Sequence, residues 1–416
     1  MKSIFLINDT LENKISFYLI SAFLIGLPFQ HFYSEILLSS FAVHTLIHLK
    51  KQSLHLLRNK TVWIIASIFF LNLMTVSYSN YRTEGFKEVD HQLGILLFPV
   101  LLSVTNLNLG KYKFQLLQIF ALTCVATTIY LYLQAFRVIY YFHLPYTSIF
   151  LKRFINQNFS SAIGLHATYL SLYVALSICI FLFLFFTGKK GKNGLYILLS
   201  IILFAGLIQL SSRSVFISFC LILIFAVPAL LINGKQKFYF SAVSVLLFLF
   251  LLLAITDIDA LRKRYMSNLE NDLTENAITP DLSETRMTRW KLEMRLISGA
   301  PFTGYGGGAE KYVLKEKYFQ EKFYRSFLIA LNAHNEYLSF LINAGVFGLL
   351  LYLFVLSFGF SRAIKQRDFL LLSLMILLSL VSISENILDV NKGIFFYSFF
   401  FSFFLLTPAQ KASADP

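Results

Sequence analysis

His334 stands directly before a long apolar segment, where an ionisable side chain is costly and therefore points to a functional role. The segment reads "NAHNEYLSFLINAGVFG" over 332–348, and Asn332 is expected to cap a helix that has His334 in its first turn. The positive end of the helix dipole disfavours an imidazolium, so the ring stays neutral, and it favours an anion nearby. A neutral imidazole can accept the proton of a hydroxyl group, so catalysis is one interpretation of His334, though not the more common one for a lone histidine. The alternative for a lone histidine at this depth is an interfacial anchor without chemistry.

Arg286 and Arg289 lie three residues apart in the hydrophilic sequence "SETRMTRWKLEMRLISGAPFTGYGGG". The Ser/Thr-rich beginning is typical of a helix N-terminus. Apolar residues then recur at helical spacing and predict one stripe, formed by Met287, Trp290, Met294 and Ile297. Both arginines and Glu293 follow its edge, so we expect a helix on the membrane surface with guanidinium groups at headgroup height. The alternative is a solvated amphipathic helix that binds lipid phosphates nonspecifically.

Further cations lie near the ends of apolar segments. Arg213, in "SSRS" at 211–214, is either fixed by hydroxyl groups in a tight turn or reaches out to the water. Arg137 lies in the outer part of an apolar span, where a charge without a partner is costly, and Arg153 follows before the next span. His166, in "HATYLSLY", is by default a satisfied core histidine.

The predicted topology brings seven of these side chains to one membrane face: Arg137, Lys152, Arg153, Arg213, Arg286, Arg289 and His334. Arginine binds phosphate oxygens in a bidentate manner and keeps its charge. Arginines beside a neutral imidazole therefore predict a phosphate or pyrophosphate ligand at the headgroup plane.

No metal or cofactor is predicted. The acidic "DID" at 257–259 could hold a divalent ion, but solvated side chains at a helix end are the more common case. The glycines of 304–308 match no nucleotide loop and favour a flexible turn over a phosphate nest. The cysteines lie in apolar runs without metal spacing and are packing residues.

The elements that position these residues are membrane helices. Of the 416 residues 57% are hydrophobic and only 14% are charged, which is too apolar for a soluble domain. Apolar runs of roughly 20 residues, with a few shorter ones, predict an all-α polytopic membrane protein with about twelve transmembrane helices. The predicted spans are 15–30, 33–48, 61–79, 91–104, 114–140, 161–187, 194–210, 214–233, 238–256, 334–359, 368–384 and 393–407.

Basic residues give the orientation of these spans. Alternate short loops are rich in lysine and arginine, so the positive-inside bias predicts both termini in the cytoplasm. The net charge of +14 thus reflects topology and not a nucleic-acid partner. We find no cleavable signal, and the first span is expected to stay as an anchor.

Three regions follow from this pattern. Residues 1–256 hold transmembrane helices one to nine, and 257–333 form a periplasmic loop with amphipathic helices, the second over 310–327. Residues 334–416 hold helices ten to twelve and a short cytoplasmic tail.

Several motifs resemble the O-antigen ligase and O-antigen polymerase superfamily of bacterial integral membrane glycosyltransferases. These are "SSRS", "TRMTRW" at 285–290 followed by "PFTGYGGG" at 301–308, and "AHNEYLSFLINAGVFG" at 333–348, the most specific of them. The predicted topology agrees with this resemblance: about twelve spans, with a large outer loop before the third-last span, are expected of a C-type glycosyltransferase. The motif "HATYLSLY" is also similar to a feature of some members.

The resemblance implies a site on the periplasmic face of the bacterial inner membrane. It implies transfer of a glycan from undecaprenyl pyrophosphate to an acceptor sugar hydroxyl, without metal or nucleotide. It assigns His334 as the catalytic histidine and Arg213 and Arg286 as pyrophosphate contacts, with Arg289 as the alternative to Arg286. Arg137, Arg153 and His166 are further candidates.

The predicted activity is that of an O-antigen ligase that attaches polysaccharide to lipid A core with inversion. Polymerase and protein O-oligosaccharyltransferase activities remain open, because they use the same donor chemistry. A lipid-linked glycan transporter is the alternative from a different class; no paired halves with interrupted helices are seen.

Overall fold

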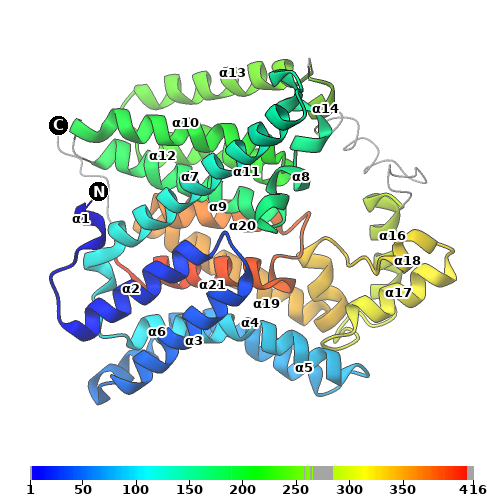
Figure 1. The fold of residues 1–416 in the computed structure, drawn as a ribbon. Helices are drawn as coiled ribbons and strands as arrows, with labels where there is room; N and C mark the ends of the chain where they lie inside the picture. Colours follow the sequence, from blue (N-terminus) through cyan, green and yellow to red (C-terminus); the bar gives the residue numbers. More distant parts are fainter. Residues whose placement is uncertain (1, 189, 257, 263–264, 266–283, 410–416) are drawn as a thin grey trace.

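The computed structural model describes residues 2–188, 190–256, 258–262, 265 and 284–409. Within these ranges the regular elements are helices and no β-strand occurs (Figure 1). The predicted all-α class is therefore confirmed. The predicted "DID" site cannot be placed as a whole, because Asp257 lies outside the described residues.

The long helices follow the predicted apolar segments. They are α2 (Leu11–Gly26), α3 (His31–Ile47), α4 (Lys60–Val76), α6 (Leu93–Val104), α7 (Leu109–Tyr141), α9 (Ala167–Thr187), α10 (Asn193–Leu210), α11 (Arg213–Leu221) continued by η6 (Ile222–Ala226) and α12 (Val227–Leu230), α13 (Gln236–Thr256), α19 (Glu336–Gln366), α20 (Phe369–Val381) and α21 (Asn391–Leu406).

Short helices connect the long ones. They are α1 (Lys2–Phe5), η1 (Lys51–Arg58), α5 (Arg82–His91), η2 (Tyr146–Phe150), η3 (Lys152–Phe154), α8 (Gln157–Ser160), η4 (Ser161–Ile163), η5 (Lys190–Lys192), α14 (Asp259–Arg262), α16 (Arg286–Ile297), α17 (Glu310–Gln320), α18 (Tyr324–Leu328) and η8 (Ile387–Asp389).

Five helical stretches of the described chain are long and apolar enough to cross a membrane: α7, α9, α10, the α11–α12 stretch and α19. A sixth is added if η1 and α4, which meet at 72°, form one span. The apolar helices α20 and α21 are shorter. The structure thus supports a helical membrane protein, whereas the number of about twelve crossings stays a prediction.

Two predicted span boundaries are corrected. The predicted span 161–187 begins only at Ala167, because Gly164, with φ +65°, ends the preceding turn and His166 caps α9. The predicted span 214–233 contains a π-helical turn directly before Val227 and Pro228. Proline has no N–H to donate, which interrupts the regular hydrogen-bond ladder there.

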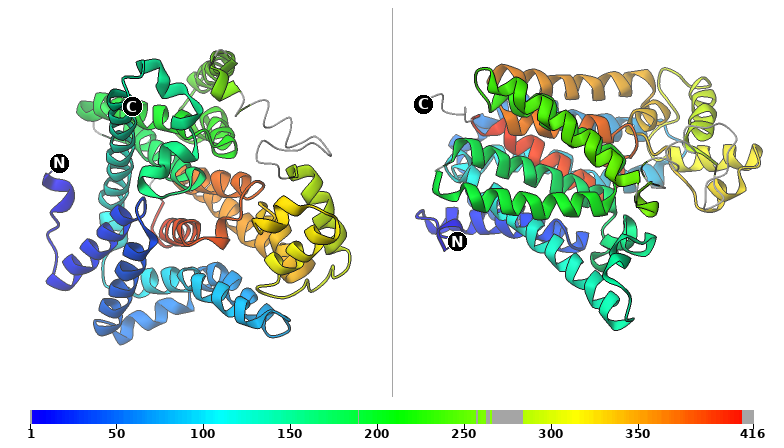
Figure 2. Two further views of the ribbon diagram at one scale, coloured as in Figure 1. Left: turned by 45° about the vertical axis from the view of Figure 1, so that its right-hand side comes forward. Right: turned by 90° about the horizontal axis from the view of Figure 1, so that it is seen from above.

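The phenylalanine-rich helix α21 forms the centre of the bundle. It packs on α6, α4, α20 and α9, and nearly every side chain along it is buried. In Figure 1 it lies between the N-terminal helices on one side and α7, α9 and α10 on the other. Helix α1 and the C-terminal end of α21 lie at one end of the bundle, and α16–α18 lie at the opposite end (Figures 1 and 2).

Helices α16–α18 enclose a second, smaller core that includes Leu292, Leu314 and Tyr318 and reaches Ile342 of α19. This packing corrects the predicted stripe of α16, because Met294 is 53% exposed. The buried face is instead formed by Arg289, Leu292, Glu293 and Ile297. Helix α16 packs with this face on α17 and α19, whereas its position relative to the membrane surface stays a prediction.

The predicted single helix over 310–327 is also corrected. The structure forms α17 and α18 with a break between them, where Lys322 has a left-handed φ of 62°. A backbone in that region cannot continue a right-handed helix.

The Pro301–Gly308 loop is a docked element and not the flexible turn that the glycines suggested. Helix α19 is kinked at Gly345, which has φ 63° and ψ −159°. The loop fills the backbone hydrogen bonds freed there: the Tyr305 N–H donates to the Ile342 carbonyl at 2.8 Å, and the Val346 N–H donates to the Pro301 carbonyl at 2.8 Å. Side chains are excluded at Gly345, because a Cβ would lie 2.2 Å from the Phe302 carbonyl oxygen.

Candidate functional site

A strained turn presents the imidazole of His334. His334 has a left-handed φ of 47°, and its backbone N–H donates to Asn332 Oδ1 at 3.2 Å. Asn335 is the cap of α19, because its Oδ1 accepts two N–H groups of the first helical turn at 3.0 and 3.2 Å. The His334 side chain is 30% exposed and so can meet a ligand.

This geometry corrects the predicted helix start. Asn335 and not Asn332 caps the helix, so His334 precedes the first turn. Both asparagines can accept N–H groups, and the sequence does not rank them. The extended backbone of Asn335, at φ −158°, decides between them.

Glu385 is the carboxylate nearest to this imidazole. The distance between His334 Nδ1 and Glu385 Oε2 is 3.6 Å, which is longer than a direct hydrogen bond but within the range of an ion pair. Thr168 Oγ1 donates to the other carboxylate oxygen at 3.3 Å. Glu385 follows α20, so the site joins segments that are 51 and 217 residues apart in the chain.

Imidazole and guanidinium groups influence the ionisation of Glu385. Burial alone would raise the pKa of Glu385, but the neighbouring His334, followed by His166 and Arg286, holds that pKa below its usual value. His166 lies directly before α9, and Arg286 is the first residue of α16. Three of the predicted site residues are thus brought to one carboxylate.

Arg289 occupies a different environment from Arg286. It is 5% exposed, and its Nη1 donates to the Asn332 carbonyl at 3.4 Å. The indole N–H of Trp290 donates to the Ala333 carbonyl at 3.0 Å. Arg289 and Trp290 therefore support the backbone that precedes His334, whereas Arg286 lies on the side of Glu385.

Arg213 is the first residue of α11, after Ser212 as cap. Helix α11 packs on α9 and α20, and those helices lead to His166 and Glu385 at their ends. Arg213 is therefore at the end of the bundle that carries the site.

Arg137 and Arg153 are placed elsewhere. Both side chains are exposed, and the guanidinium of Arg153 lies over the rings of Phe142 and Phe154 at 5.5 and 5.8 Å. Figure 2 shows this region, at the end of α7 and in η2–η3, projecting from the bundle apart from α16–α18. The structure does not bring these two predicted residues to Glu385.

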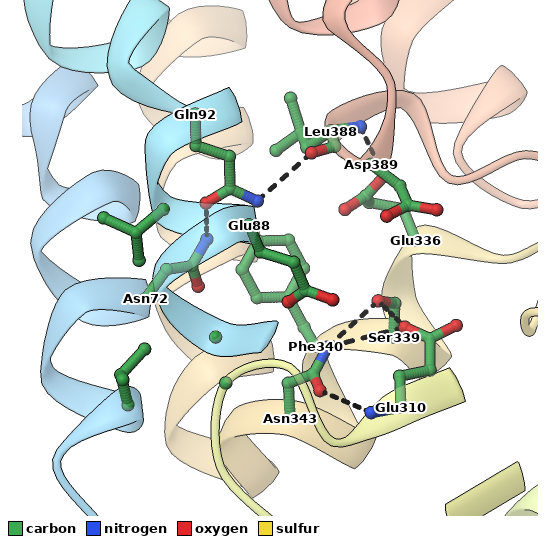
Figure 3. Close-up of a pocket in the computed structure, with 14 residues that line it drawn as sticks. Asn72, Glu88, Gln92, Glu310, Glu336, Ser339, Phe340, Asn343, Leu388 and Asp389 are labelled. Carbon is green, nitrogen blue, oxygen red and sulfur yellow. Dashed lines mark hydrogen bonds between the residues drawn. The ribbon is translucent and has the colours of Figure 1, made fainter. Parts of the chain in front are cut away.

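An acidic pocket lies on the other side of the 332–336 turn (Figure 3). Its cavity of about 40 Å³ is lined by Glu88, Glu310, Glu336 and Asp389 together with amide and hydroxyl side chains. A cavity of that size has room for one or two water molecules and not for a sugar ring. Burial, followed by the charges of Asp389 and Glu310, raises the pKa of Glu88 to about 7.

Within the described residues, no group of three or more His, Cys, Asp or Glu side chains has an arrangement that could hold a metal ion. The acidic pocket is instead tied together by hydrogen bonds between its own side chains and backbone, of which Glu310 accepts four.

Glu385 is the residue that the sequence analysis missed. It lies in "SISENILDV" at 382–390, a polar break between two apolar runs at the same end of the helices as His334. A carboxylate in such a break is a partner for the many cations predicted at that face. This placement could have identified it.

The comparisons with known proteins agree with the motifs. Residues 198–353 match the family model described as O-antigen ligase, and this range contains Arg213, Arg286 and His334. A search among curated proteins finds no match. The match supports a relationship of residues 198–353 to the O-antigen ligase superfamily.

Proposed function

We propose that this protein transfers a glycan from undecaprenyl pyrophosphate to a sugar hydroxyl of lipid A core, as an inverting O-antigen ligase. The observation that carries the proposal is the half-buried carboxylate of Glu385, which faces His334 Nδ1 at 3.6 Å and is influenced by the charges of His166 and Arg286. An imidazole for the acceptor and a guanidinium for the pyrophosphate thus act on the same carboxylate.

The acceptor hydroxyl loses its proton to His334 while its oxygen attacks the anomeric carbon. The bond between this carbon and the pyrophosphate oxygen breaks, and its electron pair leaves with the pyrophosphate. A single displacement of this kind inverts the anomeric centre. General-base catalysis typically contributes about 10²–10⁴-fold to the rate.

Glu385 orients the base. It faces Nδ1 of His334, so a proton on Nδ1 leaves Nε2 as the acceptor, and the carboxylate stabilises the imidazolium that forms. The ionised state of Glu385 suits this role.

The positive charge for the leaving group comes from arginine. Arg286 at the start of α16, and Arg213 at the start of α11, would contact the pyrophosphate oxygens. Fixed guanidinium groups stabilise the negative charge that develops as the bond breaks. Neither step needs a metal ion or another cofactor.

The proposed site faces the periplasm of a bacterial cell, in the inner membrane with both termini in the cytoplasm. The position of α1 and of the C-terminal end of α21 at the end of the bundle opposite α16–α18 supports this orientation (Figure 1). Lipid-linked donor and lipid acceptor would both reach the site from the membrane.

Reconstitution into proteoliposomes tests the proposal. Undecaprenyl-pyrophosphate-linked glycan is supplied with rough lipopolysaccharide, with further lipid-linked repeats, or with an acceptor protein. We expect glycan on lipid A core, and none with the His334→Ala variant. Growth of the lipid-linked chain would assign a polymerase instead, and glycan on the protein would assign a protein O-oligosaccharyltransferase. Translocation of the donor without any transfer would overturn the enzyme proposal.

A further inference from the structure

Glu310 connects the two backbone segments that carry His334 and Glu385. Its Oε1 accepts the backbone N–H of Ala333 at 2.9 Å and the Nδ2 of Asn386 at 3.1 Å. Ala333 precedes His334, and Asn386 follows Glu385. One buried carboxylate oxygen therefore contacts the direct chain neighbours of both partners of the pair.

The other carboxylate oxygen fixes Glu310 itself to α19. Oε2 accepts from the hydroxyl of Ser339 and from Nδ2 of Asn343 at 3.4 Å. The backbone N–H of Glu310 donates to Asn343 Oδ1 at 3.2 Å (Figure 3). With 5% exposure and four accepted hydrogen bonds, the carboxylate has little capacity left for a ligand.

Asn386 also binds the residue that follows His334 in the chain. Its Oδ1 accepts the backbone N–H of Asn335 at 2.7 Å. Ala333 and Asn335, the two neighbours of His334, are thus both tied to the chain beside Glu385, the first through Glu310 and the second directly.

From these contacts we infer that Glu310 is a positioning residue, which holds the His334 imidazole in register with the Glu385 carboxylate. The inference rests on the proposed function for its catalytic consequence, but not for its geometry. His334 needs such support because its left-handed φ is unfavourable for a non-glycine residue.

The polar side chains of 332–343 are of two kinds: most are used in internal hydrogen bonds, and His334 is available for a ligand. Asn335, Ser339 and Asn343 are used in hydrogen bonds that hold the helix start, and Glu336 accepts the Leu388 N–H at 2.9 Å. His334 instead faces Glu385 with a partly exposed ring. The hydrogen bonds around Glu310 thus fix the chain neighbours of His334 and leave its imidazole accessible.

Kinetic measurements with Glu310→Ala and Glu310→Gln give the first test, with proteoliposomes and the donor and acceptor above. Misplacement of a catalytic group by about 1 Å costs about 10²-fold. We therefore expect Glu310→Ala to lower kcat by about 10–100-fold, with KM for donor and acceptor within about twofold. Glu310→Gln retains Oε1 for the Ala333 N–H and Asn386, so kcat should recover to within about threefold of wild type.

Glu88→Ala is the matched control. Glu88 lies in the same pocket and accepts the Gly308 N–H at 3.0 Å, but it contacts neither Ala333 nor Asn386. Its kcat should stay within about twofold of wild type. Equal losses in Glu88→Ala and Glu310→Ala, or a loss in Glu310→Ala that lies only in KM, would overturn the positioning role.

A second variant keeps the test valid if Glu310→Ala does not fold. Asn386→Asp has the same size and still accepts the Asn335 N–H, but it sets a carboxylate against Glu310 in place of a donor. A fall in kcat like that expected for Glu310→Ala supports the positioning role of Glu310. An unchanged kcat overturns this role.

Cross-linking tests the geometry without activity. Cys124, Cys179 and Cys220 are replaced by alanine, and His334→Cys and Glu385→Cys are introduced. A short bifunctional thiol reagent that fluoresces only when both ends have reacted reports the proximity of the two positions. The yield should fall several-fold when Glu310→Ala is added and recover with Glu310→Gln. An equal cross-linking yield with and without the Glu310 substitutions would reject the positioning role, even if the wild-type protein transfers glycan. If the wild-type protein shows no transfer in any assay, the proposed function is rejected, and the cross-linking yield alone decides on the positioning role of Glu310.

Discussion

Glu385 is half-buried and Glu310 is buried, and both lie close to the 332–336 turn, yet their pKa values move in opposite directions. Burial acts to raise the pKa of both. For Glu385 the nearby His334, His166 and Arg286 reverse this effect and lower the pKa, whereas for Glu310 the charge of Asp389 adds to burial and the pKa is raised. Neighbouring charge therefore sets the direction of the shift in each environment.

The difference separates a cationic side of the turn from an acidic side. A pyrophosphate would be attracted by the first and repelled by the second, where Glu88, Glu310, Glu336 and Asp389 lie together. The acidic side therefore suits a framework that is tied by hydrogen bonds, and the cationic side suits the substrate. Each of the following changes acts on one side of this comparison.

The largest effect is expected from His334→Ala. It removes the base from the cationic side, so transfer to the acceptor should fall by about 10²–10⁴-fold. The rate is measured in proteoliposomes, with insertion and thermal unfolding as controls for the fold. A variant with full activity would contradict the role of His334 as the base and the assignment of the cationic side to the substrate.

Arg286→Lys and Arg289→Lys sharpen the comparison within a single helical turn. We expect Arg286→Lys to lower kcat/KM for the donor by about tenfold or more, because an ammonium cannot replace the bidentate fork. Arg289→Lys should mainly lower Tm, because Arg289 supports the Asn332 carbonyl from a buried position. A larger loss of kcat/KM for the donor in Arg289→Lys than in Arg286→Lys would assign Arg289 as the pyrophosphate contact and Arg286 as the structural residue.

Glu293→Gln tests the buried acidic side chains of α16. Burial raises the pKa of Glu293 to about 8, against the lowering influence of Arg289. Between the ordinary value of 4.5 and about 8 the unfolded chain loses a proton that the folded chain keeps, so this group reduces stability as the pH rises through that window.

Glutamine does not titrate, so Glu293→Gln should raise Tm by a few degrees at pH 8 and change it little at about pH 5. Thermal unfolding of the purified protein in detergent at both pH values measures this effect. An equal gain at the two pH values would show that ionisation of Glu293 is not the cause.

The smallest effect is expected from Arg153→Gln. Its guanidinium lies over the rings of Phe142 and Phe154 on the projecting region and not beside Glu385, so transfer should stay within about twofold of wild type. The same proteoliposome assay measures it. A loss comparable to that of Arg286→Lys would extend the cationic side to this region.

The sequence by itself determined the helical membrane class and the residue types of the site. Apolar runs placed helices such as α9 and α21 close to their observed positions, because the cost of exposing a backbone to lipid is a local property of each segment. His334 was singled out by its place directly before an apolar span, where an ionisable group is costly, and Arg286 by the cationic helical pattern and the motif around it.

Only the tertiary structure decided how these residues are arranged. It selected Asn335 over Asn332 as the helix cap, turned Arg289 inward, docked the loop at Pro301–Gly308 into the kink at Gly345, and brought Glu385 to His334. Local preferences do not contain this information, because each outcome depends on contacts between segments that are tens to hundreds of residues apart. Such contacts fix which polar group is satisfied inside the protein and which one stays available for a ligand.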